Sequence, residues 1–282
     1  MSTVLLLSLA DGCDGTRAPV LACRDALAAG GADVETVTAH SDAEIDAALE
    51  REARLVVATA ADGQLRAVVR RLVRRYAPAP TQRPADLPEN RTVPDLPPIG
   101  VLPLDTRGSD DLAARLGLPR EPAEVASAVL AGKVRRLDLL RTDAGSVTLD
   151  GALLGGADDA GRAVPWHGLI DVDSARLSDG TDPVLACAVV NASGYSTVDG
   201  LPLVVGADPA DGVVDVAVAI PVVVRRRVRV EVRRARGRAV SVAPRDDVPL
   251  LDDGVAGTLA RKRSWWVEPE AWAVYIDRCE PA

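Results

Sequence analysis

The sequence predicts an N-terminal doubly wound parallel α/β domain followed by a C-terminal antiparallel β-sandwich domain, and three observations support this fold class. The chain has 282 residues, more than the roughly 100–200 residues of one typical domain. Apolar strand patterns alternate with helix patterns up to about residue 133, as in a parallel sheet covered by helices on both faces. From residue 134 short strand patterns follow one another directly. We therefore predict one domain over residues 1–133 and a second over residues 134–282.

In the first domain, short apolar runs predict buried strands and amphipathic stretches predict helices. The predicted strands cover residues 4–7, 34–38, 55–59 and 99–102. The predicted helices cover residues 17–30, 41–52, 64–76, 110–116 and 121–131. Residues 77–98 contain seven prolines and no periodicity, so we expect a loop there. Since ligands bind at the carboxyl ends of strands in such sheets, the turns after Thr59 and Leu102 are the first places to look for a site.

In the second domain, helix signals nearly vanish and short alternating or apolar runs predict strands. These runs cover residues 135–141, 146–149, 185–191, 213–219, 228–232, 239–242 and 272–276. Asp-Gly pairs at 150–151, 211–212 and 253–254 predict tight turns between strands. The pattern is that of an antiparallel β-domain.

The composition argues against several classes of function. A net charge of −8 and a pI near 4.9 argue against general nucleic-acid binding. The four cysteines form no CxxC pair, which disfavours a zinc or redox site and favours reduced, buried thiols. The apolar stretch Val4–Ala10 is too short for a signal peptide, and no run approaches the ~18 apolar residues of a membrane helix. We expect a cytoplasmic protein whose membrane contact is peripheral, on the inner face.

Residues 60–64, Ala-Ala-Asp-Gly-Gln, lie between a predicted strand and a predicted helix. A turn of small residues at this place can cradle a phosphate, because backbone N–H groups and the helix N-terminus point at it. The same residues also suit an ordinary turn. The segment alone leaves both interpretations open.

Residues 103–119 form the second candidate segment. Gly108 and Ser109 offer a flexible backbone and a hydroxyl group near a ligand. Asp110 and Asp111 are suited to hold Mg²⁺, or simply to cap the helix that follows.

Together the two segments resemble the diacylglycerol kinase catalytic family, which includes bacterial soluble lipid kinases and sphingosine kinases. That family has a GGDGT turn after its third strand and a PLGTGNDFAR-LGLP stretch after its fourth. This chain has AADGQ at the first place and retains Pro103-Leu104 and residues 116–119 at the second, with two extra residues between them. Residues 208–215 and 251–254 resemble the family's P-A-x-DG-x-LD region and its late DGE motif. The matches follow the family's order over nearly the whole chain.

The resemblance implies an α/β nucleotide-binding domain and a lipid kinase that uses ATP and Mg²⁺. It implies nucleotide contacts at Asp62, Gly63, Gln64, Gly108 and Ser109, and metal contacts at Asp110 and Asp111. It also implies that Asp253 is the base that takes the proton of the lipid hydroxyl. Local sequence alone favours a turn aspartate before Gly254. NAD kinases share the GGDGT turn, but the chain lacks their second-domain signatures.

The chain departs from the family's pattern within the implied site. Ala60 and Ala61 replace two glycines, where a methyl group would obstruct a positive φ or the close approach of a phosphate. Gln64 replaces a threonine and Val255 replaces the glutamate of DGE. These losses support the alternative of a catalytically inactive lipid- or nucleotide-binding protein on the same scaffold.

A basic segment covers residues 225–238, where eight arginines are opposed only by Glu231. In residues 228–233 charges alternate with valines, which predicts one solvated strand face and one core face. One interpretation is a plain exposed hairpin. The functional interpretation is contact with anionic headgroups, worth ~1 kcal/mol for each basic residue. The membrane-facing residues would then be Arg225, Arg226, Arg227 and Arg229.

Trp265 and Trp266 follow three cationic residues and suit either a membrane interface or the core of the sandwich. The partner that we expect is a lipid substrate at a membrane surface. We expect no nucleic-acid partner, and a homodimer is compatible with the sequence.

Overall fold

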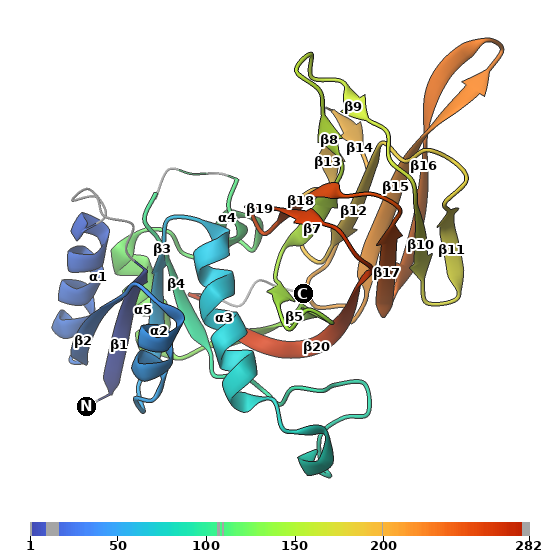
Figure 1. Cartoon of the computed structure of the whole chain (residues 1–282). Coiled ribbons are helices and arrows are strands. Elements are labelled where there is room, and N and C mark those ends of the chain that lie inside the picture. Colours follow the sequence, from blue (N-terminus) through green and yellow to red (C-terminus); the bar gives the residue numbers. More distant parts are fainter. Residues whose placement is uncertain (1, 10–16, 106–107, 109, 199, 278–282) are drawn as a thin grey trace. The chain divides into compact units, whose positions relative to one another are not determined.

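The computed structural model describes residues 2–9, 17–105, 108, 110–198 and 200–277 (Figure 1). The chain forms two compact units, unit 1 with Met1–Leu137 and Glu270–Ala282, and unit 2 with Asp138–Pro269. This division differs from the predicted boundary at 133/134, which assigned the whole C-terminal segment to the second domain. The chain returns to unit 1 because strand β20 (Arg263–Tyr275) is 13 residues long and its end pairs in parallel with β4 (Ile99–Pro103).

Unit 1 contains a parallel sheet with the strand order β4-β3-β1-β2, and the end of β20 lies on the other side of β4. Besides β4 its strands are β1 (Thr3–Leu9), β2 (Asp33–Ala39) and β3 (Arg54–Thr59). Its helices are α1 (Arg17–Ala29), α2 (Asp42–Leu49), α3 (Asp62–Tyr76), α4 (Leu112–Arg115) and α5 (Pro122–Ala131), with a 3₁₀ turn, η2, at Pro80–Gln82. Helices α1 and α5 cover one face of the sheet, and α2 and α3 cover the other (Figure 1). The predicted doubly wound α/β domain is confirmed.

The residues of β1 show why both faces of this sheet are covered. Successive strand residues point to opposite faces. Val4 and Leu6 pack in one core cluster with residues of α1 and α5. Leu5 and Leu7 point to the other face and are buried as well, at 2% and 0% exposure. An all-apolar run of this kind is typical of a central parallel strand.

Helix α3 places its first residue at the carboxyl end of β3. Its buried residues follow the helical period and face the sheet, as predicted. They are Leu65, Val68, Val69, Leu72 and Val73. The helix begins at Asp62, three residues after the end of β3. The predicted phosphate-binding turn therefore lies at the edge of the sheet where ligands bind in this class of fold.

Unit 2 is a sandwich of antiparallel sheets, as predicted. One sheet has the order β11-β10-β17-β20, with β5 pairing with β20 and β6. The other has the order β16-β15-β12-β7-β18-β19. The bounds of the first set are β5 (Val134–Thr142), β6 (Val147–Thr148), β10 (Gly168–Val172), β11 (Ala175–Asp179) and β17 (Ala239–Pro244). Those of the second are β7 (Gly151–Leu154), β12 (Ala186–Val190), β15 (Val214–Val224), β16 (Arg227–Gly237), β18 (Val248–Asp252) and β19 (Val255–Leu259).

Two short hairpins complete unit 2: β8 (Gly156–Ala157) with β9 (Ala163–Val164), and β13 (Thr197–Val198) with β14 (Leu201–Pro202). The sequence did not predict strands β10, β11, β18 and β19. They have five residues each, and each lies next to an equally short partner.

The core of the sandwich is built mainly from aliphatic side chains and two tryptophans. Trp265 is fully buried there and Trp166 is 7% exposed. Trp266 is half-buried, and its indole N–H donates to Glu268 at 2.9 Å. Trp265 therefore packs in the core of the sandwich, and Trp266 packs within unit 2 as well; neither indole is presented to a membrane interface as an exposed side chain. Of the described cysteines, Cys23 and Cys187 are free and buried, and burial raises the pKa of each thiol to about 12.

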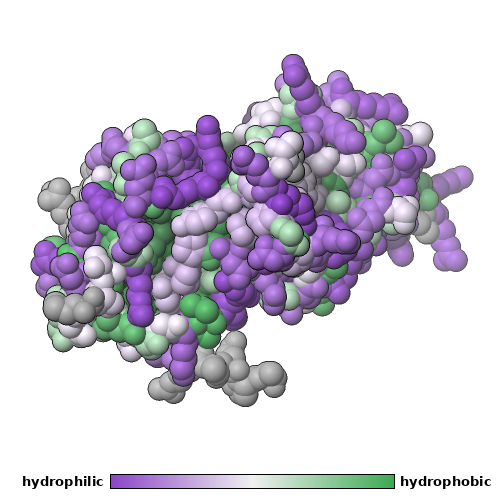
Figure 2. All heavy atoms as spheres, turned by 90° about the horizontal axis from the view of Figure 1, so that it is seen from below, coloured by the Kyte–Doolittle hydropathy of each residue, from purple (hydrophilic) through white to green (hydrophobic). Residues whose placement is uncertain are grey.

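No helix in the described ranges is both long and apolar enough to cross a membrane. The face of the molecule shown in Figure 2 is covered mainly by hydrophilic residues, and apolar residues appear there in small separate patches.

Gly100 in β4 is a sensitive point of the packing in unit 1. A Cβ atom at this position would lie 2.6 Å from Cγ2 of Val129 in α5 and 3.2 Å from Cγ2 of Val56 in β3. We predict that Gly100→Ala lowers the free energy of unfolding by about 1–3 kcal/mol, because the sheet and helix must move apart. Gly257→Ala in β19 is the control, since a Cβ there meets nothing within 4 Å. Equal urea midpoints for the two variants would contradict the prediction.

Candidate functional site

The sheet of unit 1 changes winding direction between β1 and β3, because the chain leaves β1 toward β2 on one side and places β3 on the other. The carboxyl ends of the two strands at such a point form the usual ligand crevice of this class of fold. Residues 60–64 follow β3 and lie at this crevice. Residues 10–16, which follow β1, lie outside the described residues, as does the predicted site residue Ser109.

The turn after β3 keeps an ordinary backbone conformation without the family's two glycines. Ala61 caps α3 in an extended conformation, with φ −155° and ψ 153°, and supplies no side-chain hydrogen bond to the helix. Neither Ala60 nor Ala61 has a positive φ. The expected obstruction of a positive φ therefore does not arise, and what remains is that two exposed methyl groups stand at the turn.

Gln64 closes this turn with its own side chain. Its carboxamide oxygen accepts the N–H of Ala60 at 2.7 Å, and its Nε2 donates to the carbonyl of Leu9 at 3.1 Å. The contact resembles the reverse arm of a capping box, shifted by one residue. Gln64 thus ties the end of β1 to the turn after β3, and both ends of its amide group have partners within the protein.

Asp62 joins the two candidate segments. Its Oδ1 accepts the N–H of Leu112 at 3.0 Å, and its Oδ2 lies 3.7 Å from a guanidinium nitrogen of Arg115. The Asp62 side chain is 19% exposed. The structure therefore brings together the loops after β3 and β4, as expected for parallel strands whose carboxyl ends share one edge.

The two aspartates predicted to hold a metal behave differently. Asp111 caps α4 by accepting the N–H of Ala114 at 2.9 Å, and Arg120 donates to its two oxygens at 2.5 and 2.8 Å. Partial burial acts to raise the pKa of Asp111, but these hydrogen bonds and the charges of Arg120 and Arg115 outweigh it and lower the pKa. Asp110 is fully exposed, with an oxygen 3.8 Å from Arg115. Of the two predicted roles, Asp111 thus performs helix capping.

Gly108 lies against the same arginine. Its N–H donates to the carbonyl of Asp105 at 3.4 Å, and a Cβ here would lie 3.2 Å from a guanidinium nitrogen of Arg120. Arg120 also donates to the carbonyl of Asp105 at 2.7 Å. Across the described part of the chain, no group of three or more His, Cys, Asp or Glu residues is placed to hold a metal ion.

A cavity of about 200 Å³ opens at the carboxyl ends of β1 and β2, and the sequence did not predict it. Its lining includes Leu9, His40, Ser41, Asp42 and Gln64. The signal for it was present, since residues 40–42 directly follow a strand of the same parallel sheet.

In unit 2, Asp253 and Gly254 form the two-residue turn between β18 and β19. Their φ values of 46° and 76° suit the turn type that favours Asp-Gly. The Asp253 side chain accepts the backbone N–H groups of Leu149, Asp150 and Gly151 at 2.8, 2.9 and 3.2 Å, and Asp253 is 1% exposed. Within unit 2, Asp253 is thus a turn residue, as the local sequence alone predicted, and its carboxylate holds the backbone of residues 149–151. Val255, at the place of the family's glutamate, is 43% exposed.

The other region of resemblance, residues 208–215, is also held by polar contacts, some of them at the surface. The carboxylate of Asp138 accepts the N–H of Gly212 at 2.7 Å. Arg236 is paired with Asp211 and, at 3.0 Å, with Asp215. Burial raises the pKa of Asp215 and outweighs the opposing charge of Arg236.

The tip of the β15–β16 hairpin carries the predicted membrane-facing arginines. Arg225 and Arg226 form its turn, with φ values of 49° and 63°. Among the described residues, the side chains of the four predicted arginines, Arg225, Arg226, Arg227 and Arg229, have no hydrogen-bond or ion-pair partner. The expectation of a core face is wrong at the tip, where Val228 is 71% exposed. β12 pairs with β15 only as far as Ala219, so the last residues of β15 pair with β16 alone.

We predict that Asp253→Ala lowers the free energy of unfolding of unit 2 by about 3 kcal/mol or more. Three buried N–H donors lose their acceptor, at about 1–3 kcal/mol for each unsatisfied donor, and alanine tolerates the left-handed conformation less well than aspartate. Asp246→Ala, at an exposed aspartate between β17 and β18, is the matched control. Thermal and urea unfolding measure the difference. A variant as stable as Asp246→Ala would show that Asp253 does not hold the segment that precedes β7.

Comparison with known proteins shows which family and which solved structures this chain is similar to. The sequence profile of the Diacylglycerol kinase catalytic domain matches residues 12–142. A solved structure of a diacylglycerol kinase from Bacillus anthracis strain Sterne has a TM-score of 0.67 and 14% identity, covering 98% of this chain and 97% of that one. A further structure from the same organism has a TM-score of 0.70 at the same identity and coverage. At this identity the likeness shows the fold. No curated protein matches the sequence.

Proposed function

Since residues 12–142 match the sequence profile of the diacylglycerol kinase catalytic domain, we propose that the protein is an ATP-dependent lipid kinase. It transfers the γ-phosphate of ATP to a hydroxyl group of diacylglycerol or a related lipid at the inner face of the membrane. The observation that carries this proposal is the junction of the loops after β3 and β4 at the carboxyl edge of the sheet, made by the hydrogen bond from Leu112 to Asp62.

The groups at this junction suit the phosphates of ATP. Ala61, the cap residue of α3, offers no side-chain hydrogen bond to the first turn of the helix, and a helix N-terminus attracts anions. Gly63 allows a phosphate to approach the backbone closely. Arg115 and Arg120 add positive charge beside it. The proposal thus assigns the nucleotide to residues 62–63 and the loop around Gly108.

Fewer carboxylates are suited to bind Mg²⁺ than the resemblance implied. Asp111 is unsuited as a ligand because helix capping and Arg120 engage its oxygens. Asp110 is exposed and is suited to supply one carboxylate ligand to Mg²⁺. In sites of this kind Mg²⁺ takes most of its other ligands from phosphates and water. When bound, the ion neutralises the charge that develops on the transferred phosphoryl group.

The contacts favour Asp62 over Asp253 as the carboxylate that takes the hydroxyl proton. A general base must come within hydrogen-bond reach of that proton. Asp253 is buried and accepts three backbone N–H groups of its own unit. Asp62 is partly exposed and lies at the start of α3, beside the loops assigned to the phosphates. We therefore assign the base to Asp62 and a folding role to Asp253.

One observation favours the second candidate, a catalytically inactive lipid- or nucleotide-binding protein. The N–H of Ala60 belongs to the turn that a phosphate would contact, and it already donates to the side chain of Gln64. The two exposed methyl groups of Ala60 and Ala61 narrow the same turn. An inactive protein would keep the fold and its ligand but form no product.

We predict that the purified protein phosphorylates diacylglycerol in mixed micelles with ATP and Mg²⁺, and that Asp62→Asn lowers kcat by about 100-fold or more. This is the lower range for loss of a general base. The carboxamide oxygen still accepts the N–H of Leu112, so the loop junction is retained. Asp86→Asn, at an exposed aspartate of the 77–98 loop, is the control and should leave kcat unchanged.

Two results would overturn parts of this proposal. Turnover that survives in Asp62→Asn but vanishes in a folded Asp253→Asn variant would return the base to Asp253. Saturable nucleotide or lipid binding without any product in the unmodified protein would support the inactive binding protein.

The tip of the β15–β16 hairpin supplies the docking surface that a kinase of bilayer lipids needs. Arginines at the base of the hairpin have internal partners, as Arg233 shows by pairing with Glu231 and Asp182 at 3.2 and 3.1 Å. The four arginines of the tip do not share these contacts. They lie beside Val223 and Val228, which are 76% and 71% exposed. Cations beside exposed apolar side chains suit an anionic membrane interface.

We predict that Arg227→Gln with Arg229→Gln weakens binding to vesicles of phosphatidylcholine and phosphatidylglycerol in equal parts. Two lost charges at ~1 kcal/mol each correspond to roughly 30-fold. Arg74→Gln with Arg75→Gln, on the exposed end of α3, is the matched control. Co-sedimentation measures the binding. Equal loss in both double variants would show a general charge effect and exclude a specific role of the hairpin.

A further inference from the structure

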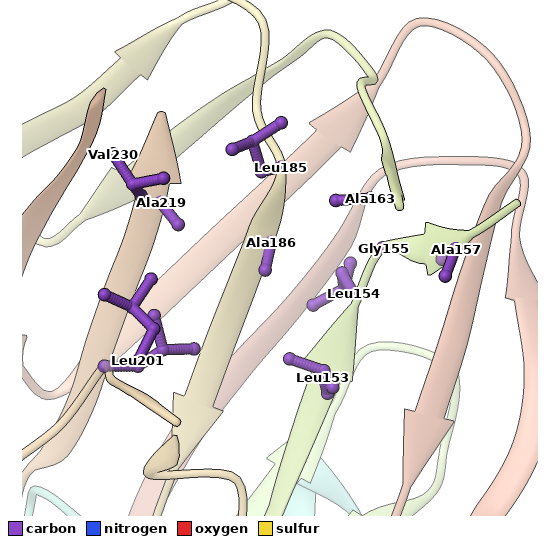
Figure 3. Close-up of a pocket in the computed structure, with 12 residues that line it drawn as sticks. Leu153, Leu154, Gly155, Ala157, Ala163, Leu185, Ala186, Leu201, Ala219 and Val230 are labelled. Atoms are coloured by element: carbon purple, nitrogen blue, oxygen red, sulfur yellow. The ribbon is translucent and has the colours of Figure 1, made fainter. Parts of the chain in front are cut away.

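A second cavity, of about 370 Å³, lies in unit 2 on the face of the six-stranded sheet that is turned away from the sandwich core (Figure 3). Its lining residues are all glycine, alanine, valine or leucine. The larger side chains come from Leu153, Leu154, Leu185, Leu201, Leu203 and Val230. A cavity with this lining can bind hydrocarbon, but its side chains cannot recognise a polar headgroup.

The sequence leaves this space open by placing small residues on neighbouring strands. Ala186 of β12 and Ala219 of β15 are directly opposite each other in the sheet, and both line the cavity. On another side, hairpin β8–β9 contributes Ala157 and Ala163. Leucines at these positions would fill the space that alanines leave. The cavity thus follows from the choice of residues, since close packing is the rule in protein interiors.

The rim of the cavity is unusually apolar for a surface. Val230 lines the cavity and is 46% exposed, and Val228 lies two residues further along the same face of β16. Val223 lies opposite Val228 across the hairpin. Val205, which is 80% exposed, follows the lining residue Leu203 by two positions. Single exposed valines are ordinary, but several of them within two residues of the lining or paired beside it mark an interaction site.

Positive charge lies next to this rim. Arg227 and Arg229 alternate with Val228 and Val230 at the start of β16, so this end of the strand has one apolar and one cationic face. The same hairpin therefore presents hydrocarbon to the cavity and cations to its surroundings. A bilayer with anionic headgroups complements both faces at once.

We propose that this cavity binds one acyl chain of a bilayer lipid and so anchors unit 2 to the membrane. The inference rests on the proposed lipid-kinase function, which places the hairpin at the membrane. It adds a lipid site that binds the acyl chain and makes no specific contact with the headgroup. At roughly 30 Å³ for each water-sized group, the cavity holds on the order of a dozen methylene groups.

The chemistry of the lining favours an acyl chain over other occupants. A peptide would bring backbone N–H and C=O groups into a cavity whose side chains offer no hydrogen bond, and each unpaired group costs free energy. A small polar metabolite is disfavoured because the lining side chains include none of the polar groups that usually orient such ligands in their sites. A flexible hydrocarbon chain meets neither obstacle.

The test is equilibrium binding of radiolabelled palmitate and of radiolabelled monopalmitoylglycerol to the full chain, below the concentrations at which each lipid aggregates. We expect one saturable site with affinities within about threefold of each other, because the headgroup stays outside. Ala163→Trp, at an exposed lining position of β9, should weaken both affinities by about tenfold or more by filling the cavity. Ala157→Trp, on the paired strand β8, is a second blocking variant.

Ala160→Trp is the matched control, because this exposed alanine belongs to the same hairpin but does not line the cavity. It should bind both lipids as the unmodified chain does, and melting temperatures confirm that all variants fold. Absence of saturable binding, or equal binding by the blocking variants and the control, overturns the proposal. The measurement uses no ATP and no turnover, so an inactive enzyme would leave its result unchanged.

Discussion

Backbone N–H groups in the loops need acceptors, and in this protein aspartate side chains supply them at every segment that resembles the kinase family. Asp62 accepts from the loop after β4, and Asp111 accepts within the first turn of α4. Asp138 holds the loop at residues 208–215, and Asp253 holds the segment before β7. Since a buried donor without an acceptor is costly, these aspartates are first of all a condition for folding. A motif aspartate therefore needs a second argument, such as exposure at the sheet edge, before a catalytic role is assigned to it.

The fold class was predictable because its signals are local. Periodicity within each segment separated the α/β part from the β part, and the helix predicted to begin at residue 41 has Ser41 as its N-cap. The partners of Gln64 and Asp253 were not predictable. Gln64 reaches Leu9, which is 55 residues away, and Asp253 reaches a segment about 100 residues away. No local pattern contains such contacts. The return of β20 to unit 1 depends in the same way on pairing with a distant strand.

The basic segment shows a different limit of sequence patterns. Alternation of arginine and valine correctly indicates a strand with two unlike faces. Whether the valine face is core depends on how far the neighbouring strands extend, and β12 stops pairing with β15 at Ala219. Beyond that point the same alternation gives exposed valines. A pattern that usually builds a core thus yields an amphipathic surface when its strand is longer than its neighbours.

The replacements in the first turn are best understood together. Alanines at 60 and 61 take ordinary φ values, so the turn no longer needs glycine. Gln64 then fixes this conformation by joining Ala60 to Leu9. A turn fixed by its own side chain loses less conformational freedom when a ligand binds, which favours affinity. In the proposed nucleotide site, the same contact engages the N–H group of Ala60, which is then not available to a phosphate in the transition state, where stabilisation raises the rate. At the proposed nucleotide site both effects would act in one direction, favouring binding of the nucleotide over catalysis at this turn, while the catalytic role proposed for Asp62 does not depend on it.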